Sequence, residues 1–295
     1  MPWPVLGPPA VATHEAFVAA GVAAAVLVLT AELRRRRRAG RPVDERIWGV
    51  VAGVLVGGAL LGRLGTWAQH LNLRANATVL EQWAYGNRSV LSGLVGAYLG
   101  ALVAKRALGW RERTGDLFAP AVAAGMAVGR IGCLLTELPG TPTGLPVGVT
   151  LTPEAAAVLP GAVAAVPLHP SFGYEIAFHL VAFVLLLRWR DRLVPGETFA
   201  LYLVGYAGFR FAVEFVRGNE AVALGLTRPQ WFLLACAPLA VWHVIRQARR
   251  GVYRPLRRGT RGGHMSGSAR LRPGPRRGTG AERGSEETTV SGATP

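Results

Sequence analysis

The sequence predicts an all-α integral membrane protein with seven transmembrane helices. Hydrophobic residues make up 51% of the 295 residues, and the mean hydropathy is +0.29. These values are unusual for a soluble domain and fit several membrane-spanning helices. Apolar stretches close to the ~20 residues that cross a bilayer recur along the chain, and basic residues gather in every second connection between them.

Seven apolar stretches are the candidate helices: residues 15–33, 47–69, 89–107, 116–138, 171–188, 197–216 and 228–246. The first is followed, rather than preceded, by an Arg cluster, which is the reverse of a secretory signal peptide, so we expect it to be retained. We therefore expect a seven-helix transmembrane domain over residues 1–246. Residues 247–295, rich in Arg, Gly, Ser and Pro, are expected to form a disordered basic cytoplasmic tail.

The placement of the basic residues predicts the orientation. The net charge of +16 raises the question of nucleic-acid binding. However, the segments "RRRRRAGRPVDER", "KRALGWRER", "RWRDR" and "RQARRGVYRPLRR" all fall on alternate connections. By the positive-inside rule, the N-terminus lies outside and the C-terminus lies in the cytoplasm. We expect no nucleic-acid partner.

Several charged residues interrupt the outer ends of the apolar stretches. Arg63, Arg130, Arg210 and Glu214 fall where a lipid-facing charge costs up to about 2.5–3.5 kcal/mol. Arg210 and Glu214 share a helical face, and Tyr206 lies one turn earlier on it. The simplest interpretation of this pair is an ion pair that lets its helix insert. The whole group is better explained by a shared cavity that opens to the outer side.

The arginines predict an anionic ligand for this cavity. Arg63 and Arg130 have no carboxylate at helical spacing, so we expect surplus positive charge, which suits the headgroup of an anionic lipid. In "HPSFGYE", Pro170 is placed to begin a helix, with His169 just outside it. That His can hold a proton or a phosphate, or it can serve as an ordinary cap.

The sequence offers no cofactor site. The two cysteines, Cys133 and Cys236, fall inside predicted helices and are interpreted as small buried side chains. The remaining histidines are scattered without metal-ligand spacing, and P-loop, dinucleotide-binding and nucleophile-elbow motifs are missing. We expect no cofactor and no metal.

Three segments together resemble one known family. The run "LYLVGYAGFRFAVEFVR", the segment "GRIGC" and the segment "HPSFGYE" are similar to prolipoprotein diacylglyceryl transferase, a bacterial inner-membrane enzyme. The resemblance implies phosphatidylglycerol as donor, the lipobox cysteine of a secreted prolipoprotein as acceptor, and an active site that faces the outer side of the membrane. The resemblance and the polar residues of the outer ends together lead us to expect two sets of site residues. The catalytic set is Arg130, Arg210, Glu214 and His169, and the substrate-binding set is Arg63, Ser92, Gly93, Cys133, Glu137, Tyr174, Glu175 and Tyr206.

The chain departs from the family pattern at two notable positions. Leu91 stands where the family usually has a His that is proposed to accept a proton, and Cys133 stands where it usually has an Asn. His169 and Glu137 are the replacement candidates for the proton acceptor. The alternative hypothesis is a non-catalytic or altered-chemistry relative that binds an anionic phospholipid in the same outward-facing pocket. A transporter that uses the arginines for an anion is a third.

Overall fold

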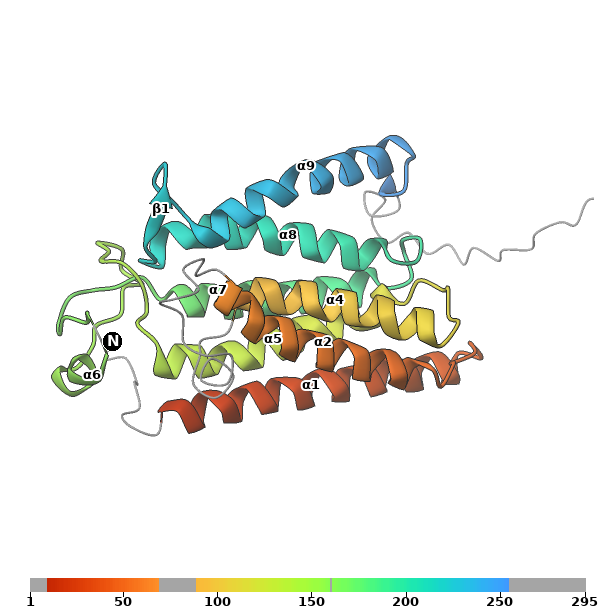
Figure 1. Cartoon of the computed structure of the whole chain (residues 1–295), viewed down its shortest axis with the longest axis horizontal. Helices are drawn as coiled ribbons and strands as arrows, with labels where there is room; N and C mark the ends of the chain where they lie inside the picture. The colour runs from red at the N-terminus through yellow and green to blue at the C-terminus, as the bar shows by residue number, and fades with distance from the viewer. Residues whose placement is uncertain (1–9, 69–88, 160, 255–295) are drawn as a thin grey trace, which may run out of the picture. The chain divides into compact units, whose positions relative to one another are not determined.

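The computed structural model describes residues 10–68, 89–159 and 161–254 (Figure 1). All of them belong to one compact unit, Met1–Gly259. The predicted tail beyond residue 254 lies outside the described residues, as does the connection between the second and third predicted stretches, residues 70–88.

Seven helices of the described chain are long and apolar enough to cross a membrane, which confirms the predicted number. They are α1 (Ala10–Arg38), α2 (Ile47–Ala68), α4 (Val90–Ala107), α5 (Gly115–Thr136), α7 (Ser171–Trp189), α8 (Glu197–Val213) and α9 (Arg228–Arg249). Several predicted boundaries differ by a few residues, and two differences matter here. The helix α1 continues through the Arg cluster to Arg38, and the last residues of the sixth predicted stretch form the 3₁₀ helix η1 (Glu214–Val216) instead of a regular end of α8.

The smaller elements all lie between helices. A short helix, α6 (Pro153–Val158), interrupts the connection from α5 to α7, and a hairpin of β1 (Ala221–Ala223) and β2 (Leu226–Thr227) joins η1 to α9. In Figure 1, α6 and β1 appear together at the end of the bundle where α1 begins. We call this the site end, and we call the other end, where α1 and α9 terminate in Arg residues, the basic end.

Helices α5, α7 and α8 form the inner layer of the bundle. Ala119 and Ala123 of α5 pack against Leu186 of α7 and Tyr202 of α8 in one buried cluster. Small residues on α5 allow this close packing, since helices in a membrane associate through van der Waals contact rather than a hydrophobic driving force. By contrast, large apolar side chains such as Val103, Val181 and Leu239 are exposed, as expected for surfaces that face lipid.

Helices α2 and α4 meet through a row of glycines. A Cβ atom added at Gly57 would overlap the carbonyl oxygen of Gly96, and one added at Gly100 would overlap that of Gly53. The two backbones are therefore in direct contact, and even the smallest side chain does not fit between them. This explains the glycine-rich composition of both stretches.

The basic end is held by ion pairs on short connections. Asp191 follows α7 and pairs with Arg35 Nη2 of α1 at 3.0 Å and with Arg41 Nη1 at 2.6 Å. Burial raises the pKa of Asp191, but the two guanidinium groups outweigh burial and hold this pKa below its ordinary value. The carboxylate of Glu197, at the start of α8, lies 3.0 Å from His243 Nε2, and this contact joins α8 to α9.

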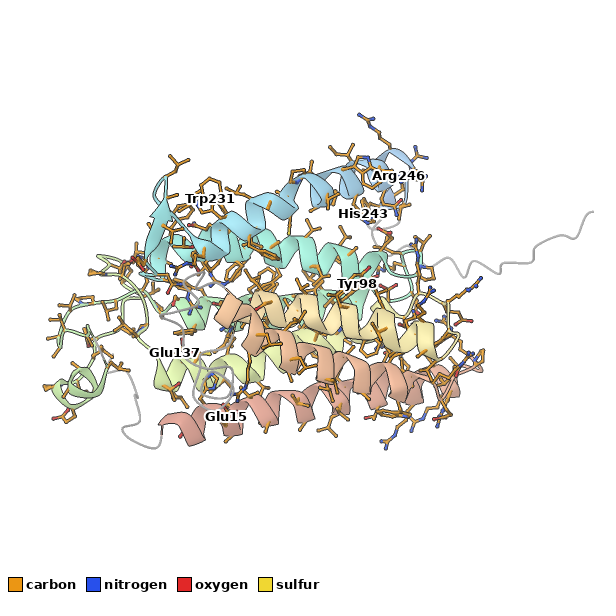
Figure 2. The ribbon with its side chains drawn as sticks, viewed as in Figure 1. Glu15, Tyr98, Glu137, Trp231, His243 and Arg246 are labelled. Atoms are coloured by element: carbon orange, nitrogen blue, oxygen red, sulfur yellow. The ribbon has the colours of Figure 1, made fainter. Side chains whose placement is uncertain are left out.

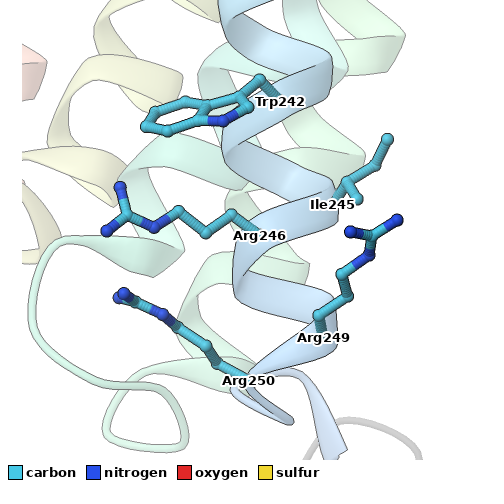
Figure 3. Close-up of a pocket in the computed structure, with 5 residues that line it drawn as sticks. All are labelled: Trp242, Ile245, Arg246, Arg249 and Arg250. Carbon is cyan, nitrogen blue, oxygen red and sulfur yellow. The ribbon is translucent and has the colours of Figure 1, made fainter.

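A shallow hollow lies on the surface at the basic end of α9, lined by Trp242, Ile245, Arg246, Arg249 and Arg250 (Figure 3). The guanidinium of Arg246 lies over the Trp242 ring at 4.9 Å. A Trp together with several Arg is typical of the membrane–water interface. This hollow therefore lies at the basic end of the bundle, whereas the predicted site residue Glu137 lies at the site end.

The site end is tied together by the chain that leaves α5. Residue Thr141 donates its N–H to the Val216 carbonyl at 2.9 Å and accepts the His169 N–H at 2.9 Å. A Cβ on the preceding Gly140 would run into the carbonyl oxygens of both Val216 and His169. Gly140 therefore lets one extended segment join the end of η1 to the start of α7.

We expect Gly57→Ala to destabilise the protein, because the new methyl group would push apart the backbones of α2 and α4. Overpacking of this kind typically costs about 1–3 kcal/mol, which would lower the thermal unfolding midpoint in detergent. Gly208→Ala on α8 is the matched control, since its Cβ would meet no atom within 4 Å. Equal midpoints for the two variants would contradict the direct backbone contact.

Candidate functional site

The centre of the site is the carboxylate of Glu175, which is 0% exposed in the first turns of α7. Arg130 Nε of α5 lies 2.7 Å from its Oε2, and Arg217 Nη1, just after η1, donates to its Oε1 at 2.7 Å. One carboxylate thus holds two guanidinium groups that come from different parts of the chain. The sequence predicted Arg130 and Glu175 as site residues but did not predict their pairing.

Arg130 has no carboxylate at helical spacing, but it does have a carboxylate partner in Glu175. Its partner comes from another helix, which spacing along α5 cannot reveal. The remaining nitrogens of the guanidinium point to two other predicted residues: Nη2 lies 3.5 Å from the Tyr206 hydroxyl and Nη1 lies 3.6 Å from Cys133 Sγ. Tyr206 therefore contacts Arg130 of α5, rather than only sharing a face with Arg210.

Arg210 and Glu214 form the ion pair that their spacing predicted. The second oxygen of Glu214 accepts hydrogen bonds from Asn219 Nδ2 at 2.8 Å and from Thr227 Oγ1 at 2.9 Å. Thr227 also caps α9, in a capping box with Gln230. This buried pair thereby joins the end of α8 to the start of α9.

Cys133 and Glu137 meet a residue that sequence reasoning set aside. His14 Nε2 of α1 lies 3.5 Å from Cys133 Sγ and 3.9 Å from Glu137 Oε1. Glu137 also lies 3.7 Å from Arg217 Nη2. Figure 2 shows Glu137 at the same end of the bundle as Glu15, the neighbour of His14, whereas His243 and Arg246 lie at the other end.

His169 and Tyr174 stand at the edge of this group. His169 Nδ1 lies 3.3 Å from the Tyr174 hydroxyl, and both side chains are partly exposed. Pro170 precedes the first residue of α7, as predicted. The Ser171 hydroxyl donates to the Pro139 carbonyl, so the helix start is anchored to the chain that leaves α5.

The remaining predicted residues lie on α2 and α4. Ser92 and Gly93 belong to the first turn of α4, where the Ser92 N–H is capped by Ser89 Oγ at 3.3 Å and a Cβ on Gly93 would approach Gly58 and Gly62. Arg63 is half-buried on α2, next to Gly62. Ser92 is thus fixed at the start of α4, and Gly93 lies where α4 approaches α2.

Three residues of the site were missed. Arg217 is the last residue of the quoted run "LYLVGYAGFRFAVEFVR", but its role becomes visible only when η1 directs it toward Glu175 and over the Phe172 ring, at 4.4 Å. His14 was passed over because its neighbours are more than a hundred residues away in sequence. His179 is fully buried, and its Nδ1 lies 3.0 Å from the Tyr202 hydroxyl.

The chemistry of this arrangement suits an anion. Three arginines, Arg130, Arg210 and Arg217, gather at one end of the bundle, and each is held in place by a buried carboxylate. An arginine offers five N–H donors, so a carboxylate that takes one or two of them leaves others for a phosphate group.

The family model described as prolipoprotein diacylglyceryl transferase matches residues 3–246, which include every residue of this site. The chain belongs to the prolipoprotein diacylglyceryl transferase family. This membership agrees with the seven apolar helices and makes the chain a multi-pass bacterial membrane protein of a transferase family.

Relatives in this family come from distant bacteria. The phosphatidylglycerol–prolipoprotein diacylglyceryl transferase of Cupriavidus pinatubonensis is 34% identical over 236 residues, which cover 74% of this chain and 80% of that protein. The enzyme of the same name from Mycobacteroides abscessus is 30% identical over 247 residues, covering 77% and 71%. Transferase 1 of Streptomyces coelicolor is 32% identical over 225 residues, covering 72% and 63%.

We expect Glu175→Gln to destabilise this family member strongly, because Arg130 and Arg217 would lose the carboxylate that they share. Removing one partner of a buried ion pair typically costs about 3–5 kcal/mol, measured as a lower thermal unfolding midpoint in detergent. Glu154→Gln in α6 is the matched control, since Glu154 is exposed. A Glu175→Gln protein with a native midpoint would show that the carboxylate does not hold the cluster together.

Proposed function

We propose that this protein transfers the diacylglyceryl group of phosphatidylglycerol to the lipobox cysteine of secreted prolipoproteins and releases glycerol phosphate. The observation that carries the proposal is the buried Arg130–Glu175–Arg217 cluster at one end of a seven-helix protein of this family. The names of the relatives supply the donor and the class of acceptor.

The reaction is an alkylation of sulfur. The acceptor thiol loses its proton, and a sulfur lone pair forms a C–S bond to the glycerol carbon that carries the phosphate. The C–O bond to that phosphate breaks, and its electron pair stays on the leaving oxygen of glycerol phosphate. Negative charge therefore grows on the leaving phosphate, and this is where fixed donors act most strongly on the rate.

Arg130 and Arg210 are the proposed stabilisers of this charge, and Arg217 joins them. Their carboxylate partners hold the guanidinium planes in place before the lipid arrives, so little reorganisation is needed during the reaction. In this proposal Tyr206 orients Arg130, and His169 with Tyr174 contacts the headgroup from the edge of the site. Arg63, Ser92 and Gly93 line the lipid path on α2 and α4.

The proton acceptor is not the usual one, because Leu91 replaces the family's His. His169 and Glu137 are the candidates from sequence. Of these, Glu137 lies beside His14 and Cys133, whereas His169 contacts Tyr174.

We expect Arg130→Ala and Arg210→Ala each to reduce turnover by about a hundredfold or more, which is typical when one donor to a developing oxyanion is removed. The measurement is transfer from phosphatidylglycerol to a lipobox peptide by the purified protein, with the unfolding midpoint checked for each variant. Arg188→Ala, at the exposed basic end of α7, is the matched control. Folded variants that retain full turnover would contradict the role of these arginines.

A non-catalytic relative is the second candidate, and Leu91 is the observation that favours it. Such a protein would bind phosphatidylglycerol through the same arginines but would produce no lipidated peptide. In the transfer assay it is recognised by saturable lipid binding that Arg210→Ala weakens, together with no transfer by the native chain.

The site end is proposed to face outward from the bacterial inner membrane, with the basic end and the tail in the cytoplasm. The Arg residues at the ends of α1 and α9 support this orientation through the positive-inside rule. The prolipoprotein would then meet the site after export, and the donor would enter from the outer leaflet.

We expect a single cysteine at position 154 to react with a membrane-impermeant maleimide in intact spheroplasts, whereas one at position 111 should react only after permeabilisation. The substitutions Glu154→Cys and Arg111→Cys are made in a protein that lacks Cys133 and Cys236. Both positions are exposed, so reactivity reports the side of the membrane. The opposite pattern would reverse the proposed orientation.

A further inference from the structure

Three potential metal ligands converge where α1 meets the end of α5. The ligand atoms of His14, Cys133 and Glu137 all lie within 4.8 Å of one another. His14 Nε2 is 3.5 Å from Cys133 Sγ and 3.9 Å from Glu137 Oε1. These residues offer one nitrogen, one sulfur and one oxygen, from two helices that pack along each other.

This ligand set suits zinc. Zinc takes Cys, His and carboxylate ligands in a tetrahedron, with bonds of about 2.0–2.3 Å. In such a tetrahedron a His nitrogen and a Cys sulfur stand about 3.6 Å apart, and a His nitrogen and a carboxylate oxygen about 3.4 Å. The observed His–Cys separation fits already, and the Glu137 side chain, which is 43% exposed, can move to close the other separations, none of which exceeds 4.8 Å.

Two guanidinium groups lie next to this cluster. Arg130 and Arg217 approach the cluster, at 3.6 Å from Cys133 Sγ and 3.7 Å from a Glu137 oxygen. Both guanidinium groups are, however, already paired with Glu175. Access is open on one side, because His14 is 27% exposed while Cys133 is buried.

We propose that His14, Cys133 and Glu137 bind a zinc ion whose fourth position takes the acceptor cysteine thiol. Three protein ligands and one open position are the arrangement of catalytic zinc sites. The second half of this proposal rests on the proposed function, whereas the binding of the metal does not.

Zinc would supply the step that Leu91 leaves open. A thiol that coordinates zinc is deprotonated by the metal, and its proton passes to water. The sulfur keeps the electron pair with which it forms a C–S bond to the glycerol carbon. The C–O bond breaks, and its own electron pair leaves with glycerol phosphate. The thioether product is neutral and binds zinc weakly, so it is released.

The site is tested first without any activity. The full chain, purified in detergent without a polyhistidine tag, is dialysed against Zn²⁺ and its metal content is measured. It is also titrated with Co²⁺, whose visible spectrum reports tetrahedral geometry and a thiolate ligand. We expect one ion per chain in the native protein and at least tenfold weaker binding in His14→Ala, Cys133→Ser and Glu137→Gln.

The control for the metal measurement is Cys236→Ser, which removes the exposed cysteine of α9 and should bind like the native chain. Sub-stoichiometric binding by the native protein would overturn the site. Stoichiometric binding that survives both Cys133→Ser and His14→Ala would also overturn it, since the ion would then lie elsewhere.

The role in transfer is tested on the same preparations. We expect a chelator to abolish transfer to the lipobox peptide and Zn²⁺ to restore it. Transfer that proceeds unchanged in metal-free protein would overturn thiol activation while leaving the metal site intact. Stoichiometric, ligand-dependent zinc binding without transfer under any condition would support the site and count against the proposed function.

Discussion

The shared carboxylate of Glu175 is the interaction on which the rest of the site depends. It is fully buried, and it binds Arg130 of α5 and Arg217 beyond η1 at the same time. Three segments that are distant in sequence are therefore fixed by one side chain. Since an unpaired charge at this depth would cost several kcal/mol, the helices have little freedom to separate at the site end.

Around this cluster, two kinds of packing divide the molecule. The helices α5, α7 and α8 form the inner layer and carry the arginines and their carboxylates. Helices α2 and α4 meet backbone to backbone through glycines and contribute chiefly a tightly packed hairpin. In the proposed function, the first arrangement would hold the phosphate of the lipid, whereas the second would line the surface along which that lipid passes.

Much of the fold was predictable because apolar length and the alternation of Arg clusters are local properties of the sequence. The seven helices follow from them, and the i,i+4 pair of Arg210 and Glu214 follows from helical periodicity. Arg130 was recognised as unusual, but its partner was not, because Glu175 reaches it only through the packing of α5 on α7. For the same reason the meeting of His14 with Cys133 carries no signal in either segment alone.

Arg217 shows a different limit of sequence reasoning. It belongs to a motif that was noticed, but a regular continuation of α8 would have directed it along another face. The switch to the tighter η1 after Val213 redirects it toward Glu175. A change of helix type over three residues is decided by tertiary contacts, such as those that Glu214 makes with Asn219 and Thr227.

The two ion pairs of the site also differ in when they can form during synthesis. Arg210 and Glu214 leave the ribosome almost together, so their helix enters the membrane with its charge already compensated. Glu175 is made about 45 residues after Arg130, which at ~5–20 residues per second corresponds to a delay of roughly 2–9 s. During this interval Arg130, within two turns of the end of α5, is without the carboxylate that it pairs with in the folded protein. The first pair thus needs only its own helix, whereas the second can form only after α7 has been made and has packed against α5.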